Sequence, residues 1–342
     1  MKQITLGKTG LVVEKNGFGC LPIQRISEQE AVYLLHKAYD GGINFFDTAR
    51  VYTDSEQKLG AAFSSMRGKI VLATKTAALT KDDFWSDLET SLRTLKTDYI
   101  DIYQFHNPPF CPKPGGADGL YDAALEAKKQ GKIGHISLSN HRITVAHEAI
   151  DSGLYDTLQF PFSYLAGEQE QELVRKCRAQ NMGFIAMKGM AGGLIRDGLT
   201  AAAWMATQEG VLPIWGVQRE SELDEFLQFI RTGAELTEAC KAVIERDREE
   251  LRGGFCRGCG YCMPCPAGIE INQCARMSLM LRRAPTAEWL TEEWQEKMHR
   301  IEDCLHCGHC TSKCPYGLNT PELLKANYED YWNVLAESRK DK

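Results

Sequence analysis

Four polar side chains stand at or just beyond the ends of three successive apolar runs in the first third of the chain. The first run ends at Asp47 and is followed closely by Tyr52, the second ends at Lys75, and the third ends at His106. A short apolar run that stops at a polar residue is typical of a buried strand that delivers side chains to a rim. A carboxylate, a phenol, an ammonium group and an imidazole gathered at one rim could hold and transfer protons.

The stretch GINFFDTARVYTDSE, residues 42–56, resembles the signature of the aldo-keto reductase family. Asp47, Tyr52, Lys75 and His106 match that family's Asp-Tyr-Lys-His tetrad. The resemblance implies an oxidoreductase that interconverts a carbonyl and an alcohol with a nicotinamide cofactor. It also implies a (β/α)8 barrel, in which the carboxyl ends of the strands meet at one mouth and carry the catalytic groups.

The residue types suit that chemistry. A free phenol has a pKa near 10 and is a poor proton donor at neutral pH. The ammonium group of Lys75 is expected to lower the pKa of Tyr52, and Asp47 is expected to keep Lys75 charged and oriented. His106 is expected to position the carbonyl oxygen of the substrate.

Three residues on the middle strands are candidates for holding the carboxamide of the nicotinamide. By the resemblance, Ser139 and Asn140 match the family's Ser-Asn pair, and Gln159 matches its glutamine. These residue types are common at strand ends, so the assignment depends on the tetrad beside them.

Two positions depart from the family pattern. Where the family commonly stacks an aromatic ring on the nicotinamide, this chain has Met187 and Lys188. Where NADP-preferring members place a basic cluster, it has WGVQRESE, with Arg219 as the cation. An arginine can bind a phosphate through two hydrogen bonds, or it can lie in solvent as a surface residue. The sequence therefore leaves NADP, NAD and loss of the nucleotide open.

Eight of the 13 cysteines fall in two short runs near the C-terminal end of the chain. The second run, CLHCGHCTSKCP, matches the bacterial ferredoxin pattern C-x2-C-x2-C-x3-C-P, and the first, CRGCGYCMPCP, has one residue fewer before its last cysteine. Thiols stay reduced in the cytosol, so clustered cysteines in a cytosolic protein indicate ligands rather than disulfides. The eight residues are Cys256, Cys259, Cys262, Cys265, Cys304, Cys307, Cys310 and Cys314.

Two [4Fe-4S] clusters are the metal centres that this spacing predicts. A zinc ribbon supplies its four ligands as two separated pairs, which two runs of four closely spaced cysteines fit poorly. In bacterial ferredoxins the fourth cysteine of each run ligates the other cluster, and that precedent implies two crossed ligand sets. The first ligand set is then Cys256, Cys259, Cys262 and Cys314, and the second ligand set is Cys304, Cys307, Cys310 and Cys265.

The elements that must position these groups alternate regularly along the chain. After a predicted hairpin at residues 3–13, eight strand–helix units follow from residue 17 to about 231, the number that closes a (β/α)8 barrel. A Pro- and Gly-rich loop, 107–119, follows the His106 strand and carries Cys111, close enough to the predicted mouth to touch substrate. The other isolated cysteines are expected to be small apolar residues.

After residue 235 the pattern changes to amphipathic helices around the cysteine runs. Helices are predicted at about 236–251, 271–283, 288–301 and 321–336. We therefore expect two domains, an aldo-keto reductase-like barrel at 1–235 and a helical ferredoxin-like domain with two [4Fe-4S] clusters at 236–342. This layout resembles bacterial aldo-keto reductases fused to a ferredoxin-type domain.

Composition argues against several other classes of function. The 342 residues, 43% of them hydrophobic, suffice for one large barrel and a smaller unit. The net charge of -6, with acidic and basic residues interspersed, argues against nucleic acid or an anionic membrane as the main partner. The N-terminal residues lack the apolar core of a signal peptide, and no stretch approaches the roughly 20 apolar residues of a membrane helix. The protein is therefore expected to be cytoplasmic.

The two kinds of redox group differ in the number of electrons they pass. A nicotinamide passes two electrons as a hydride, whereas each cluster passes one, and the sequence shows no flavin motif to link them. The barrel could therefore carry out NAD(P)H carbonyl chemistry with clusters that are structural or sense redox state. Alternatively, the clusters could transfer electrons between the mouth and a ferredoxin-like partner protein. The third hypothesis, a non-enzymatic redox-responsive binding module, is disfavoured by the complete tetrad.

Overall fold

The computed structural model describes residues 2–251, 254–283 and 286–340. The chain divides into two compact units. The first unit combines the residues up to Gly189 with Asp197–Ile244, and the second combines Met190–Arg196 with the residues from Glu245 onward.

The first unit is a closed barrel of eight parallel strands, as the sequence predicts. Each strand pairs with the next strand in the sequence, and the last strand closes on the first. In chain order the strands are β3 (Gly17–Gly19), β4 (Phe45–Asp47), β5 (Val71–Thr76), β6 (Ile100–His106), β7 (Ile133–Ser139), β8 (Thr157–Pro161), β9 (Gly183–Met187) and β10 (Val211–Gly216).

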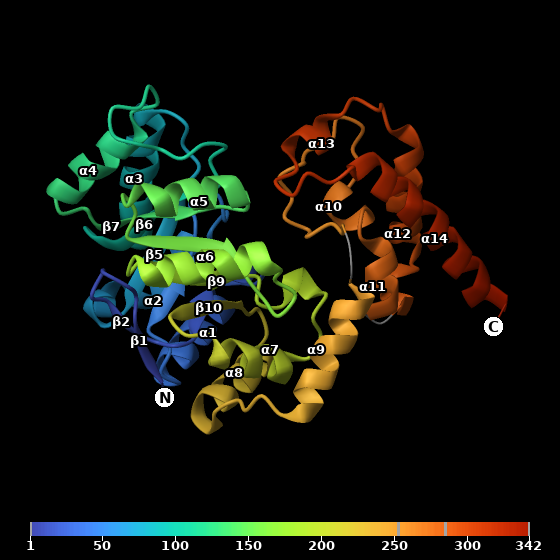
Figure 1. Cartoon of the computed structure of the whole chain (residues 1–342), viewed down its shortest axis with the longest axis horizontal. Helices are drawn as coiled ribbons and strands as arrows, with labels where there is room; N and C mark the ends of the chain where they lie inside the picture. Colours follow the sequence, from blue (N-terminus) through green and yellow to red (C-terminus); the bar gives the residue numbers. More distant parts are fainter. Residues whose placement is uncertain (1, 252–253, 284–285, 341–342) are drawn as a thin grey trace. The chain divides into compact units, whose positions relative to one another are not determined.

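A helix follows each strand of the barrel, and Figure 1 shows these helices beside the strands. The helices are α1 (Glu28–Asp40), α2 (Ser55–Phe63), α3 (Lys81–Leu95), α4 (Leu120–Lys129), α5 (Ile143–Ser152), α6 (Glu168–Ala179), α7 (Gly198–Thr207) and α8 (Glu220–Thr232). Two short 3-10 helices, η1 (Pro22–Arg25) and η2 (Ser64–Lys69), lie in the connections. The sequence explains individual boundaries: Ser27 and Glu30 form a reciprocal capping box at the start of α1.

An antiparallel hairpin of β1 (Gln3–Thr5) and β2 (Val12–Glu14) closes one end of the barrel. Leu6 and Val13 of this hairpin belong to the same buried cluster as the barrel residues Phe45 and Ile102. A bridge from Gly7 to Met182, the residue before β9, places the hairpin at the amino ends of the strands. The hairpin therefore does not cover the carboxyl ends of the strands, where the predicted site lies.

The boundary between the two units differs from the predicted one at residue 235. It falls within α9 (Glu238–Glu250), at Ile244, because the two halves of that helix bury their side chains in different units. Cys240 is buried in the first unit, where Thr237 contacts its thiol. Asp247 is buried in the second unit, where its carboxylate pairs with Arg283 at 2.5 Å.

The second unit is helical, as the sequence predicts, and no strand is assigned in its described residues. Its elements are η3 (Ala191–Gly193), α10 (Ile271–Cys274), α11 (Met277–Arg283), η4 (Thr286–Trp289), α12 (Glu292–His299), η5 (Arg300–Asp303), α13 (His309–Lys313) and α14 (Thr320–Lys340). Buried Met277, Met298, Leu324 and Tyr331 form part of its interior.

The single helix predicted at 271–283 is interrupted between α10 and α11. Asn327 of α14 satisfies the backbone at this break, because its side chain donates to the carbonyl of Ala275 and accepts from the amide of Ser278. The break leaves Arg276 between the two short helices, with its side chain only 7% exposed.

Across the part of the chain that the structure describes, every helix is too short or too polar to span a membrane.

Candidate functional sites

Three of the predicted catalytic residues point into the barrel because of where they fall on their strands. Side chains alternate along a strand, so residues two apart share a face. Asp47 lies two residues after the core residue Phe45, and Lys75 lies two residues after the core residue Ala73. The strands are staggered, with Lys75 beside Gln104 in register, so His106 extends the same inward series on β6.

Lys75 and Asp47 form a buried ion pair at the centre of the site. The Nζ atom of Lys75 lies 2.6 Å from Oδ2 of Asp47, and it also donates to the carbonyl of Thr48 at 2.6 Å. The side chains of Lys75 and Asp47 are 1% and 3% exposed.

Tyr52 and His106 complete the group. The Nζ atom of Lys75 lies 5.3 Å from the centroid of the Tyr52 ring. The rings of Tyr52 and His106 have their centroids 5.8 Å apart and meet edge to face. The structure thus brings together all four residues of the predicted tetrad.

The expected effect of Lys75 on Tyr52 is wrong for this structure. Burial raises the pKa of Tyr52 above its ordinary value, and the negative charge of Asp47 raises it further. The low polarity of the surroundings therefore outweighs any lowering of the pKa by the ammonium group of Lys75. Tyr52 is therefore a protonated phenol throughout the physiological range.

His106 is neutral for a related reason. Burial lowers its pKa to about 3, and the positive charge of Lys75 acts in the same direction. Its Nδ1 atom is buried and has no hydrogen-bond partner in the described structure. The imidazole is thus available to bind a polar group that enters the mouth.

Gln104 is a member of the site that the sequence reasoning missed. Its Nε2 atom donates to Oδ1 of Asp47 at 2.9 Å, and Ser137 contacts its Oε1 atom at 3.3 Å. The signal in the sequence was its position two residues before His106, on the inward face of the same strand. Gln104 therefore helps to orient the carboxylate that holds Lys75.

The three residues predicted to bind the nicotinamide carboxamide are buried, but they differ in how many of their polar atoms already have hydrogen-bond partners. Gln159 donates weakly to Asp47 at 3.4 Å, and its Oε1 atom is buried without a hydrogen-bond partner in the described residues. Asn140 donates to the carbonyl of Pro108 in the 107–119 loop, and its Oδ1 atom accepts from the backbone amides of the two residues that follow it. Ser139 is 1% exposed and pairs in register with Gln159.

The other predicted nucleotide contacts lie at the ends of β9 and β10. Met187 packs against the buried cluster inside the barrel, and Lys188 follows it with φ +58°. Arg219 is exposed at the start of α8, and its guanidinium pairs with Glu222 at 2.8 Å. This ion pair lies at the surface, and both interpretations of Arg219 stay open.

His141 is a second residue that the sequence reasoning missed. It is 4% exposed, and its pKa is far below the usual value because of burial and the nearby positive charges of Lys188 and Arg142. It therefore adds a neutral imidazole to the surroundings of His106. Its place directly after the Ser-Asn pair was the available signal.

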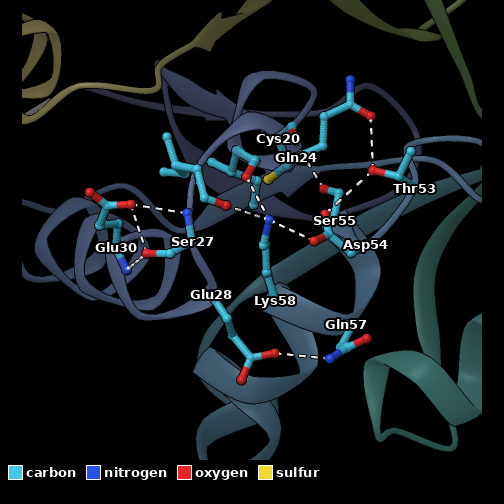
Figure 2. A network of polar contacts seen from close by, with 12 residues as sticks. Cys20, Gln24, Ser27, Glu28, Glu30, Thr53, Asp54, Ser55, Gln57 and Lys58 are labelled. Carbon is cyan, nitrogen blue, oxygen red and sulfur yellow. Dashed lines mark hydrogen bonds and ion pairs between the residues drawn. The ribbon is translucent and has the colours of Figure 1, made fainter.

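The loop that carries Tyr52 is held by buried side chains of α2. Figure 2 shows Lys58 at the centre of one network: it donates to the carbonyls of Ile23 and Ile26 and forms an ion pair with Asp54 at 2.8 Å. Ser55 donates to the carbonyl of Cys20 at 3.0 Å. These contacts fasten the loop after β4 to the segment after β3.

A second network fixes the same loop from its other side. The buried carboxylate of Glu56 forms an ion pair with Arg50 and accepts hydrogen bonds from Thr74 and Ser91, each at 2.7 Å. Thr74 is the neighbour of Lys75 on β5, so Glu56 ties the Tyr52 loop to the strand that carries the lysine.

Cys111 does not lie open to substrate as the sequence predicted. It is 6% exposed, and its thiol lies 3.7 Å from the hydroxyl of Tyr155. That hydroxyl also donates to the carbonyl of Pro112 at 2.5 Å. Cys111 therefore helps to anchor the 107–119 loop.

The eight clustered cysteines of the second unit line two cavities. One cavity is lined by Cys256, Cys259, Cys262 and Cys314, together with Arg257 and Tyr316. The other cavity is lined by Cys304, Cys307, Cys310 and Cys265, together with Leu305 and His306. Each cavity thus gathers three cysteines of one run and the last cysteine of the other.

Each cavity gathers four thiols, which is the number of cysteine ligands that one [4Fe-4S] cluster takes. Gly260 and Gly308 have φ of +82° and +74°, which lets the backbone curl around each cavity.

Comparison with known proteins identifies a family match in each part of the chain. Residues 15–211, more than half of the chain, match the aldo/keto reductase family. Residues 255–319 match a 4Fe-4S dicluster domain.

Curated relatives align with the barrel part. The uncharacterized oxidoreductase YrpG of Bacillus subtilis is 30% identical over 226 residues, which cover 57% of this chain and 68% of that protein. The aldo-keto reductase AFTS1 of Alternaria alternata is 26% identical over 237 residues, which cover 55% of this chain and 64% of that protein. The matches span about two thirds of the length of these relatives.

Solved structures share the fold. The holo form of aldo-keto reductase AKR11C1 from Bacillus halodurans has a TM-score of 0.63 at 22% identity, covering 72% of this chain and 96% of that one. An aldo/keto reductase from Klebsiella pneumoniae in complex with NADP and acetate has a TM-score of 0.61 at 23% identity, covering 72% of this chain and 94% of that one. The chain belongs to the aldo/keto reductase family of oxidoreductases and carries a C-terminal 4Fe-4S dicluster domain.

Proposed function

We propose that the barrel reduces a small carbonyl compound to an alcohol, or oxidises the alcohol, at Asp47, Tyr52, Lys75 and His106. The observation that carries this proposal is the buried Lys75–Asp47 ion pair beside Tyr52 and His106, all at the carboxyl ends of the strands. The barrel scaffold places catalytic groups at that end.

Each residue has a distinct role in the proposed reaction. Neutral His106 binds the carbonyl oxygen and orients it, and Tyr52 gives its proton to that oxygen as negative charge develops. Lys75 stabilises the tyrosinate that remains, and Asp47 holds Lys75 in place. A bound nicotinamide nucleotide would supply the hydride, so that hydride and proton together convert the carbonyl into an alcohol.

The residues present fit the carboxamide of a nicotinamide. The buried Oε1 atom of Gln159 lacks a partner in the described structure and can accept from the amide of the carboxamide, with Ser139 beside it. NADP is present in the Klebsiella structure, and we assign the nucleotide of this chain as NADP or NAD. A ribose phosphate would have to compete with Glu222 for Arg219.

We further propose that the first and second ligand sets each hold one [4Fe-4S] cluster. The two cysteine-lined cavities and the matched dicluster domain support this assignment. The bound clusters would accept and give single electrons. The partner is then a one-electron carrier of the ferredoxin class, for which the exposed Cys307 of the second set offers a contact. In the alternative, a plain NAD(P)H carbonyl reductase, the clusters serve structure or redox sensing.

Replacement of Tyr52 by phenylalanine tests the catalytic assignment. Tyr52→Phe should reduce carbonyl reduction about 10²–10⁴-fold, the usual contribution of one acid–base group, while nucleotide binding stays largely intact. Steady-state rates and nucleotide fluorescence titrations measure the two effects separately. Unchanged turnover would remove Tyr52 from the mechanism.

An anaerobic absorbance spectrum before and after addition of NADPH or NADH shows whether the nucleotide reduces the clusters.

A further inference from the structure

Positive charge is distributed unequally between the two ligand sets of the second unit. We propose that Arg276 and Arg257 make the first ligand set the site of higher reduction potential. An electron that arrives at the second set from a one-electron donor then comes to rest at the first. This inference rests on the proposed occupancy of both sets by [4Fe-4S] clusters.

Arg276 lies against the loop that carries the first ligand set. A Cβ atom at Gly258, between Cys256 and Cys259, would lie only 2.7 Å from Nη1 of Arg276. Gly258 also has φ +63°. Glycine suits this position both because a side chain would collide with Arg276 and because a positive φ is unfavourable for other residues. The glycine at this position therefore allows the guanidinium of Arg276 to approach the backbone of the loop closely.

The charge of Arg276 is not cancelled by the hydrogen bonds it makes. Its Nη1 atom donates to the carbonyl of Gly192 at 2.7 Å, and its Nη2 atom donates to Oε1 of Gln273 at 2.9 Å. Both acceptors are neutral, and the side chain is only 7% exposed. A buried guanidinium with neutral partners keeps its full field toward the adjacent sulfur ligands.

Arg257 adds a second cation to the same cavity. It lies between Cys256 and Cys259 in the chain and lines the cavity of the first ligand set. Its guanidinium carbon lies 3.8 Å from the centroid of the Phe255 ring. Its Nη1 atom is buried without a hydrogen-bond partner in the described residues.

Other cations of the second unit act differently. Arg283 is also buried, but its guanidinium pairs with Asp247 at 2.5 Å and with Glu250 at 3.0 Å, so its charge is neutralised. Arg300 lies near Gly268, close in sequence to Cys265 of the second set, but it is exposed and water screens its charge.

The sign of the effect follows from the charge of the electron. Reduction adds negative charge to a cluster, so a nearby unneutralised cation stabilises the reduced form and raises the potential. Burial acts in the opposite direction, because it disfavours the more highly charged form. The two sets differ in exposure at only one cysteine, the exposed Cys307 of the second set. The effect of Arg276 and Arg257 on the potential of the first set outweighs the effect of this difference in exposure.

The proposed transfer is balanced in electrons. A one-electron carrier protein loses one electron at the second set, and the first set finally holds it. No bond forms or breaks, and no proton is required.

Anaerobic redox titration of the full-length protein, followed by electron paramagnetic resonance, tests the inference. The wild type should show two separate transitions. Arg276→Gln should shift only the higher one toward lower potential, and Arg276→Lys, which keeps the charge, should shift it less. Arg300→Gln is the control, because it also removes an arginine of the second unit but an exposed one whose charge water screens. It should leave both transitions in place.

The outcomes separate this inference from the proposed occupancy. Iron and sulfide analysis that finds no clusters would overturn the occupancy itself. Two clusters with coincident transitions, or an unmoved higher transition in Arg276→Gln, would overturn only the assignment of potentials. If Arg276→Gln loses its iron, Arg257→Gln replaces it: a shift of the same higher transition supports the inference, and no shift overturns it.

Discussion

Several buried side chains inside the barrel hold the Lys75–Asp47 ion pair in place. Taking an ion pair out of water is costly, and removing one partner of a buried pair typically costs 3–5 kcal/mol. Here Asp47 accepts from Lys75, Gln104 and Gln159, all buried. Replacing a buried ion pair by well-packed apolar residues is often neutral or stabilising, so the network is consistent with the proposed catalytic site.

The pKa values of the tetrad predict the pH dependence of the reaction. In the proposed mechanism His106 acts in its neutral form, which it keeps above about pH 3. In the same mechanism Tyr52 acts as the protonated acid, and its raised pKa preserves that form beyond the ordinary range of a phenol. We therefore expect kcat/KM for carbonyl reduction to be nearly independent of pH from about 5 to 9. Measurement with the full-length protein checks this, and a titration near pH 6.5 that disappears in His106→Gln would contradict it.

Strand-end polarity made the tetrad predictable, because Asp47, Lys75 and His106 each interrupt an apolar run. Gln104 was not found, because a glutamine inside a strand carries no such interruption. Its role appears only when the alternation of inward-facing positions is combined with the stagger of β5 and β6. The sign of the Tyr52 pKa shift was also missed, because burial depends on the packing of loops that the sequence does not specify.

At the scale of elements, the segment after β9 is the least expected feature. β9 ends at Met187, yet Met190–Arg196 belongs to the second unit. Arg276 donates to the carbonyl of Gly192 and Arg283 to that of Leu194 at 2.9 Å. These arginines lie over 80 residues away in sequence, so no local pattern could reveal the contacts. The strand–helix alternation, in contrast, is local and was predicted in full.

This segment should loosen when the second unit loses its metal. The amides of Gly193 and Ile195 bond to the carbonyl of Met190, and the arginines hold the turn from outside. Removing iron with a chelator under anaerobic conditions should therefore speed hydrogen exchange in the peptide covering 190–196. The loop at 52–58, held by Lys58 within the barrel, is the matched control and should not change. Equal protection of 190–196 with and without iron would contradict this prediction.

At the scale of the whole molecule, the two units are stabilised in different ways. The barrel has a buried apolar core of its own. In the second unit, each proposed cluster joins the two cysteine runs, because the first ligand set includes Cys314 and the second includes Cys265. Bonds that close a loop of about 40–50 residues restrict the unfolded chain and so favour the folded one. In this crossed arrangement the proposed clusters would stabilise the folded second unit, whether or not they also transfer electrons.

Metal removal should therefore unfold the second unit and leave the barrel folded. Protein purified anaerobically is expected to hold about eight iron and eight sulfide per chain, the content of two [4Fe-4S] clusters. After chelation, α14 should lose its hydrogen-exchange protection, because its buried Leu324 and Tyr331 pack within the cysteine-rich unit. Strands β4 to β8 should keep theirs, because their hydrogen bonds and core lie wholly in the barrel. A metal-free protein with α14 still protected would show that helix packing alone sustains the second unit. Loss of protection in both units at once would show that the barrel depends on the clusters as well.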